Sequence, residues 1–308
     1  MKRLDLAAFI TGPETGNRVN RLNGAVADRA ILPIVGPRGS GKDRFLTWWV
    51  QEGCASRVYT KDSTIKPDDI VLVNAQPGPV SSVPVGCVVF TRLWRELQEI
   101  ERARGNGEPR RPLGYTKACT ETHVVSVIDD NVAPLMDSLL PQALVVLNAQ
   151  YLDSRTLGYL LELRSPLKRT GASIPMLSLI LCTSVEDSSG ENSRFGKLLS
   201  DFGEAKKPWE KRMIFPLMEG REFVSVMLRL IDQNLDAIVG NDVVKTQMYD
   251  DFATWTDCNW WLVRELVIML DRVLGPRREN QRRIITAKVL EQVKKMWLER
   301  SGGSPANG

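Results

Sequence analysis

Short apolar runs alternate with longer segments of helical periodicity through most of the chain. The runs are almost continuously apolar, which is typical of strands that are covered on both faces of a sheet. The segments between them repeat apolar residues at helical spacing. We therefore predict an α/β fold, a parallel sheet with helices on both faces. The predicted strands are Ala30–Val35, Ile70–Asn74, Ala143–Leu147, Met176–Cys182 and Met213–Phe215.

The pattern changes after Glu219, where no further strand-like run occurs and four segments carry apolar residues at helical spacing. These segments predict a second, helical domain. The last residues are rich in Gly, Ser, Pro and Asn, which is typical of a disordered tail. The predicted organisation is an N-terminal arm at 1–29, an α/β nucleotide-binding domain at 30–217, a helical domain at 218–300 and a tail at 301–308.

Composition narrows the class of protein. The 308 residues carry a net charge of +4 and include one histidine and five cysteines. Because no cysteines form a CxxC pair, a zinc-thiolate site is excluded, and scattered cysteines favour reduced core residues of a cytosolic protein. The N-terminus lacks the apolar stretch of a signal peptide, and no apolar run approaches the roughly 20 residues of a membrane span. We expect a cytoplasmic protein without a membrane partner.

A glycine-rich motif, GPRGSGK, follows the first predicted strand and opens a helix. This is the GxxxxGK core of the Walker A motif. Its glycines let successive backbone N–H groups point inward around an anion, and the start of the helix adds a positive dipole end. The candidate ATP-binding residues are Gly36, Pro37, Arg38, Gly39, Ser40, Gly41 and Lys42, whose ammonium group would bind the β- and γ-phosphates.

The residue after the lysine is Asp43, where the motif requires a serine or threonine hydroxyl that binds Mg²⁺. A carboxylate can also bind the metal, but it adds a negative charge beside the phosphates. Its place at the start of a helix reduces that penalty. We therefore predict weak or altered Mg²⁺ dependence.

The second catalytic element should be an apolar strand that ends in two acids, an aspartate for Mg²⁺ and a glutamate for the attacking water. The candidate strand Leu144–Leu147 is followed by Asn148 and Ala149 instead. Asn148 can accept a hydrogen bond from metal-bound water, whereas Ala149 has no basic group, so hydrolysis should be slow or absent. A rival is Ser126–Asp130, an apolar run with two acids, but it lies inside a helical pattern.

A third polar element follows the strand that ends near Cys182. The hydroxyl of Thr183 or Ser184 would contact the γ-phosphate or its water, although capping of a neighbouring element explains these residues equally well.

The order of these features resembles that of AAA+ ATPases: a phosphate loop, a strand with a degraded acidic end, a polar-ended strand, an arginine and a helical lid. Leu144–Asp153, LVVLNAQYLD, resembles the IDEAQHL segment of the TniB/TnsC transposition regulators, with Asn148 and Ala149 where that family has Asp and Glu. The likeness extends over about residues 25–300 and includes Tyr115-Thr116, Cys182-Thr183, Ser193-Arg194-Phe195 and Leu217–Leu228.

The resemblance implies a P-loop (AAA+) fold, a three-layer parallel sheet followed by an all-helical lid. It implies that Arg194 is the arginine finger that reaches a neighbouring subunit's nucleotide, that Thr183 is sensor 1 and that Arg264 is a lid sensor. Members of that family assemble on DNA as ATP-dependent rings or filaments and recruit a transposase. The implied partners are therefore further copies of this chain, duplex DNA, and transposase or target-selection proteins.

Several basic positions are candidates for contact with the phosphate backbone, and each also fits a solvated surface. They are 164–169, 206–212, 277–283, Lys117, Arg92 and Arg95. Because no base-reading motif is present, DNA binding should be sequence-independent and sensitive to salt. Two other readings stay open: a working ATPase of another AAA+ branch that uses Asp129 or Asp130, and a scaffold that binds no nucleotide.

Overall fold

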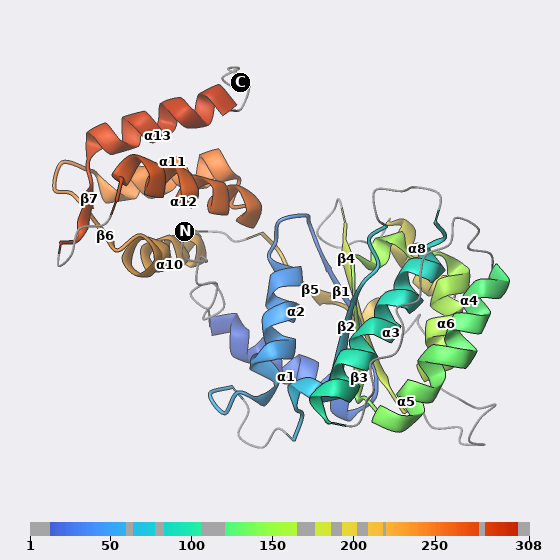
Figure 1. Ribbon diagram of the computed structural model, residues 1–308. Helices are drawn as coiled ribbons and strands as arrows, with labels where there is room; N and C mark the ends of the chain where they lie inside the picture. Colours follow the sequence, from blue (N-terminus) through green and yellow to red (C-terminus); the bar gives the residue numbers. More distant parts are fainter. Residues whose placement is uncertain are drawn as a thin grey trace. The chain divides into compact units, whose positions relative to one another are not determined.

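A computed structural model describes residues 13–59, 64–77, 83–105, 121–164, 176–185, 193–201, 209–217, 220–276 and 281–300. The chain divides into two compact units (Figure 1). One, the α/β unit, comprises Pro13–Arg38 and Lys42–Pro216. The other, the helical unit, comprises the described residues of 217–300 together with Gly39–Gly41.

The α/β unit contains a parallel five-stranded sheet in the order β2-β3-β4-β1-β5. Its strands are β1 (Ile31–Gly36), β2 (Ile70–Asn74), β3 (Ala143–Leu147), β4 (Ser178–Ser184) and β5 (Met213–Ile214). Every residue of β1 and β3 is buried, as the continuous apolar runs predicted. Because the strands are parallel, their carboxyl ends meet at one edge of the sheet, where ligands of such folds bind.

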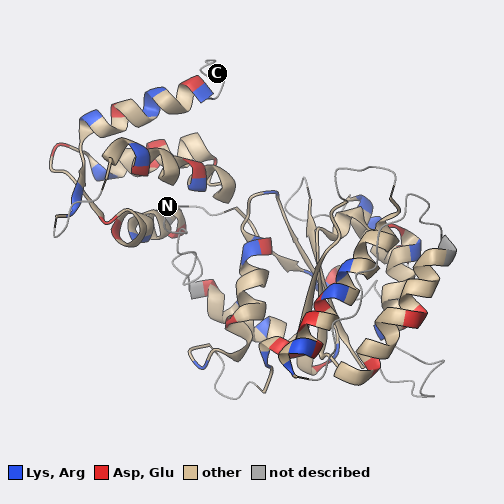
Figure 2. Cartoon of the chain, viewed as in Figure 1, with Lys and Arg blue, Asp and Glu red and all other residues tan. Residues whose placement is uncertain are grey.

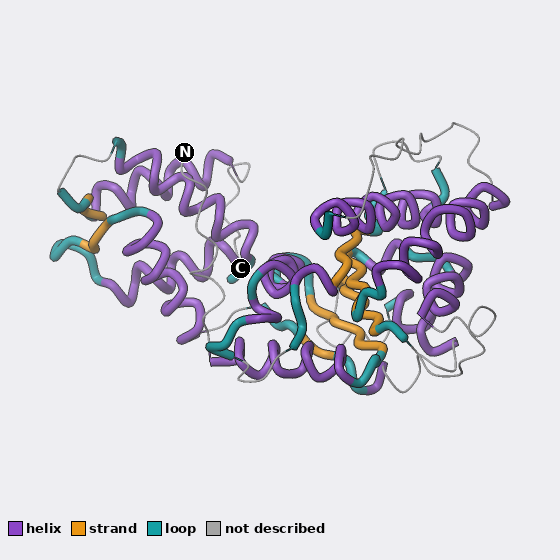
Figure 3. Tube along the Cα trace, turned by 60° about the horizontal axis from the view of Figure 1, so that its bottom comes forward, coloured by secondary structure: helices purple, strands orange, loops and turns teal. Residues whose placement is uncertain are grey.

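Helices cover both faces of this sheet (Figures 1 and 3). They are α1 (Pro13–Ala27), α2 (Lys42–Gln51), α3 (Val85–Ala103), α4 (Glu121–Val127), α5 (Ala133–Leu139), α6 (Ser154–Arg164) and α8 (Arg194–Asp201). α1 and α2 lie on one face, and α3 to α6 lie on the other. The N-terminal region expected as an arm or short helix therefore includes a helix that buries Val19 and Leu22 completely.

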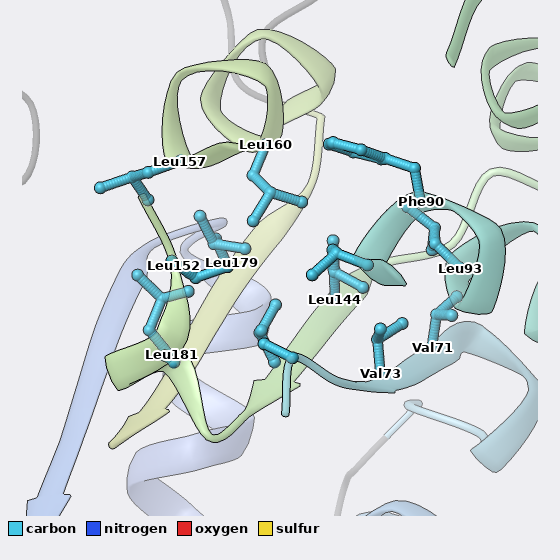
Figure 4. Close-up of a cluster of buried hydrophobic side chains, with 14 of the residues drawn as sticks. Val71, Val73, Phe90, Leu93, Leu144, Leu152, Leu157, Leu160, Leu179 and Leu181 are labelled. Carbon is cyan, nitrogen blue, oxygen red and sulfur yellow. The ribbon is translucent and has the colours of Figure 1, made fainter. Parts of the chain in front are cut away.

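Side-chain alternation along β4 separates the two cores. Leu179 and Leu181 belong to the core cluster under α3 and α6, where they lie near Leu157 and Leu160 of α6 (Figure 4). Since successive side chains of a strand point to opposite faces, Ile180 and Cys182 point to the face that carries α1 and α2. This alternation brings Cys182 to the start of α2, at the candidate site.

The helical unit contains α10 (Gly220–Arg229), α11 (Lys245–Thr256), α12 (Trp260–Leu274) and α13 (Ala287–Arg300). They pack around a core that includes Phe223, Phe252, Val263, Leu266 and Trp297. The unit also contains a short parallel ribbon of β6 (Ala237–Val239) and β7 (Arg283–Ile285). The sequence pattern did not predict this ribbon, because three residues per strand are too few to show a period.

The expectation that all cysteines are reduced is wrong for Cys87, which is disulfide-bonded and buried in the core. Cys54, Cys182 and Cys258 are free. Within the described ranges, no helix is long and apolar enough to cross a membrane.

Candidate nucleotide site

The glycine loop joins the end of β1 to the start of α2, as the motif predicted. Gly39 and Gly41 have φ angles of +89° and +82°, a left-handed region that side chains with a Cβ rarely adopt. The two glycines are therefore required for the turn itself. Lys42 is the first residue of α2, so the loop ends where helix N–H groups and the helix dipole favour an anion.

Lys42 carries the clearest sign of a binding site. Its side chain is only 3% exposed, and its Nζ donates to Pro37 O at 3.2 Å and to Ser184 Oγ at 2.8 Å. Both acceptors are neutral, and among the described residues Lys42 forms no ion pair. Ser40, in the same loop, has a buried hydroxyl without a hydrogen-bond partner. A buried cation without a counter-ion is unfavourable, so these residues fit an anionic group such as a nucleotide phosphate.

Asp43 lies in the first turn of α2, and its carboxylate faces β4. The Cys182 thiol donates to Asp43 Oδ1 at 3.1 Å. Burial raises the pKa of Cys182 well above its ordinary value, and the negative charge of Asp43 raises it further. The thiol therefore stays protonated and donates to one carboxylate oxygen, while the other oxygen does not take part in this contact.

The end of β3 carries amides in place of acids. Asn148 has a left-handed backbone, φ 57°, and its Nδ2 donates to Asn74 Oδ1 at 3.0 Å. Ala149 is fully buried in the hydrophobic core, so its side chain takes no part in the site. Gln150, two residues after Asn148, is the next polar side chain at this edge of the sheet. The sequence pattern did not predict it as a site residue.

Gln150 connects the ends of β3 and β4. Its Oε1 accepts hydrogen bonds from Ser184 N at 3.0 Å and from Thr183 Oγ1 at 3.4 Å, and its Nε2 donates to Asn148 Oδ1 at 3.3 Å. Together with Lys42 and Asn74, these residues form a continuous polar chain across the carboxyl ends of β4, β3 and β2. Every side chain of this chain except Lys42 is neutral. The chain can position groups and donate or accept hydrogen bonds, but it contains no carboxylate that would act as a base.

Arg92 of α3 extends this polar chain beyond β2. Its guanidinium donates to Asn74 O and, at 2.8 Å, to Gln76 O. Arg92, which the sequence also offers as a candidate DNA contact, therefore fixes the loop after β2.

The other predicted residues have different surroundings. Thr183 is completely buried, Arg194 is exposed at the first residue of α8, and Arg38 is exposed in the glycine loop. Arg264 is exposed on α12, within the helical unit. Asp43 accepts a hydrogen bond from Cys182, and Asn148 contacts Asn74 and Gln150. The described residues hold no cluster of three or more His, Cys, Asp or Glu side chains.

The rival acidic strand is wrong. Ser126 lies in α4, and Asp129 and Asp130 lie in the π-helical turn Ile128–Val132. Ser126 Oγ donates to Asp130 Oδ2 at 2.7 Å. These acids therefore follow a helix on one face of the sheet and not a strand end at the site.

Charged residues of both signs are mixed along the described helices (Figure 2). In the sequence of α13, for example, Lys294 and Lys295 lie between Glu291 and Glu299. Lys117, Tyr115-Thr116 and parts of all three basic stretches lie outside the described residues.

No protein-family model matches the chain, and no curated protein matches it. Among solved structures, it is similar to a Walker-type ATPase, PABY2304 of Pyrococcus abyssi, with a TM-score of 0.51 and 16% identity over 96% of this chain and 76% of that chain. It is also similar to the Hsp104–ADP complex of S. cerevisiae, with a TM-score of 0.40 and 11% identity over 85% of this chain and 45% of that one. Only the first structure, with the higher TM-score, is used to assign the fold. This chain therefore has the fold of a Walker-type ATPase, and the predicted class, a parallel sheet with helices on both faces followed by a helical domain, is confirmed except that the helical unit also contains the β6–β7 ribbon.

Proposed function

We propose that this protein binds ATP at Gly36–Asp43 and hydrolyses it slowly or not at all. The main support for binding is the buried ammonium of Lys42, which lies at the end of a left-handed glycine turn and has no counter-ion among the described residues. The neutral amides of Asn148 and Gln150 carry the proposal for slow hydrolysis, since general-base catalysis contributes about 10²–10⁴-fold and neither amide can accept a proton from water at neutral pH.

Lys42, the loop N–H groups and the start of α2 would hold the phosphates. Asp43 would bind Mg²⁺ through the carboxylate oxygen that Cys182 does not occupy. A metal held by one carboxylate, without a hydroxyl beside it, supports the prediction of weak or altered Mg²⁺ dependence.

We further propose that ATP binding drives assembly of several copies on duplex DNA, and that the assembly recruits transposition partners. Support for this step comes from the resemblance of Leu144–Asp153 to the TniB/TnsC segment and from the exposed position of Arg194 on α8. Slow hydrolysis would make such an assembly long-lived, because the chemical step that dismantles it would be missing.

Two measurements on the full chain test the proposed function. Steady-state phosphate release should lie near the background rate, with or without duplex DNA. Electron micrographs with duplex DNA and a non-hydrolysable ATP analogue should show ordered filaments or rings that are absent without the analogue. Robust turnover that is lost in Lys42→Ala would contradict slow hydrolysis, and DNA that stays bare with the analogue would contradict assembly.

A protein that binds no nucleotide is the second candidate function. It is favoured by the two hydrogen bonds that Lys42 already makes to neutral acceptors. The absence of any heat or thermal shift on addition of an ATP analogue would support this candidate over the first.

A further inference from the structure

Lys42 and Ser184 form a hydrogen bond that a bound polyphosphate would have to replace. The ammonium group has three donors, and the shorter of its two hydrogen bonds, at 2.8 Å, goes to Ser184 Oγ. In P-loop proteins the same ammonium reaches the β- and γ-phosphates. Because Pro37 O and Ser184 Oγ leave only one donor, Lys42 can reach both phosphates only by giving up one of these hydrogen bonds.

We infer that Ser184 is an internal competitor of the nucleotide and that it sets the affinity of the site for polyphosphate. The inference rests on the nucleotide binding proposed above. In this role the Ser184 hydroxyl lowers the affinity for nucleotide, whereas a hydroxyl that contacts the γ-phosphate would raise it. A phosphate contact would strengthen binding, whereas a competitor for Lys42 weakens it.

The surroundings of Ser184 hold its hydroxyl in place. Ser184 is the last residue of β4 and pairs in register with Gly36, at the end of β1. Its backbone N–H donates to Gln150 Oε1 at 3.0 Å, so the strand end is also fixed from the side of β3. Lys42 is a long side chain with several rotatable bonds, whereas Ser184 has one. When a phosphate enters, Lys42 is therefore the group that moves.

Gln150 is the positioning residue of this arrangement. Its amide is held in turn by Asn148 Oδ1, and Asn148 is held by Asn74. The side-chain amides of Asn74, Asn148 and Gln150 thus hold the end of β4 in place. Ser184, at that end, in turn restrains Lys42. Loss of Gln150 would loosen Ser184 without removing its hydroxyl.

The test is a calorimetric titration of the full chain with ADP, a non-hydrolysable ATP analogue and AMP. Hydrogen bonds to charged groups contribute enough to change an affinity by roughly tenfold. Ser184→Ala should therefore bind ADP and the ATP analogue roughly tenfold more tightly than the parent chain. AMP has no β-phosphate for Lys42, so its affinity should not change. Ser184→Thr, which restores a hydroxyl, should return the affinity toward that of the parent.

Ser126→Ala is the matched control, since it removes an exposed serine hydroxyl that hydrogen-bonds Asp130 on α4. Gln150→Leu is the second variant and should tighten polyphosphate binding by a smaller factor. Weaker or unchanged binding of ADP and the ATP analogue by Ser184→Ala overturns the inference, and so does an equal gain for AMP. If the parent chain binds none of the three nucleotides, the proposed function fails and not the competition alone.

Discussion

Replacement of Lys42 by methionine separates a ligand-binding lysine from a structural one. The effective cost of desolvating an ammonium group is several kcal/mol. Its two hydrogen bonds, to Pro37 O and Ser184 Oγ, return about 1.5–3 kcal/mol each. The two contributions nearly cancel in the nucleotide-free protein. Because Pro37 and Ser184 are only partly buried, water can replace the lost donor.

We therefore expect Lys42→Met to change the free energy of unfolding of the nucleotide-free chain by less than about 2 kcal/mol. The response to nucleotide should differ sharply. A ligand at 100 times its Kd stabilises a protein by about 2.7 kcal/mol, which corresponds to a rise in Tm of about 5–10 °C for a unit of this size. The parent chain should show this rise with an ATP analogue, and Lys42→Met should not.

Urea titration measures the first quantity and thermal melting with and without the analogue measures the second. Lys197→Met, on the exposed side of α8, is the matched control and should keep the full thermal response. Destabilisation of nucleotide-free Lys42→Met by more than about 3 kcal/mol would mean that the lysine mainly supports the fold. A preserved thermal response in that variant would place the nucleotide elsewhere. Either result would show that Lys42 is not the phosphate-binding lysine proposed above.

Three further changes test separate parts of the site. Asp43→Thr restores the metal-binding hydroxyl and removes a negative charge beside the phosphates, so ATP should bind severalfold more tightly with Mg²⁺; an unchanged ratio of affinities with Mg²⁺ and with EDTA would contradict this. Burial raises the pKa of Cys182 above its ordinary value of 9.0 in the folded chain only, so above about pH 9 the unfolded chain loses a proton that the folded chain keeps, and stability falls as pH rises. Urea titrations between about pH 8 and pH 10 should show a shallower fall for Cys182→Ala, and equal slopes would exclude this contribution. Arg194→Ala should leave ATP binding by the single chain intact and weaken assembly on DNA, and light scattering that is unchanged would remove Arg194 from the subunit contact.

The sequence predicted the sheet well because each strand is buried on both faces and its apolar run is nearly continuous. The glycine loop was also predicted correctly, because the left-handed backbone at Gly39 and Gly41 favours glycine at those positions. The β6–β7 ribbon carried no such signal. Its strands are too short for alternation to be visible, and their paired residues lie 46 positions apart, as Ala237 and Arg283 do.

The polar chain at the strand ends was predicted only in part. Asn148 was predicted because it stands where the motif requires an acid. Thr183 and Ser184 were predicted because they follow an apolar strand. Gln150 and Asn74 have neutral side chains without a recognisable spacing, so only the strand order β2-β3-β4 reveals that they meet. Likewise, Ser184 and Lys42 lie 142 positions apart, and no periodicity links residues at that separation. The contact between Cys182 and Asp43 depends on which face of β4 the thiol occupies.

Lys42 is buried and has no counter-ion among the described residues, and we expect its ammonium group to bind a nucleotide phosphate. Calorimetric titration of the full chain with a non-hydrolysable ATP analogue measures this binding. We expect saturable binding of one analogue per chain that disappears in Lys42→Met and persists in Lys197→Met. Absence of heat with the parent chain, or binding that survives the loss of Lys42, would contradict it.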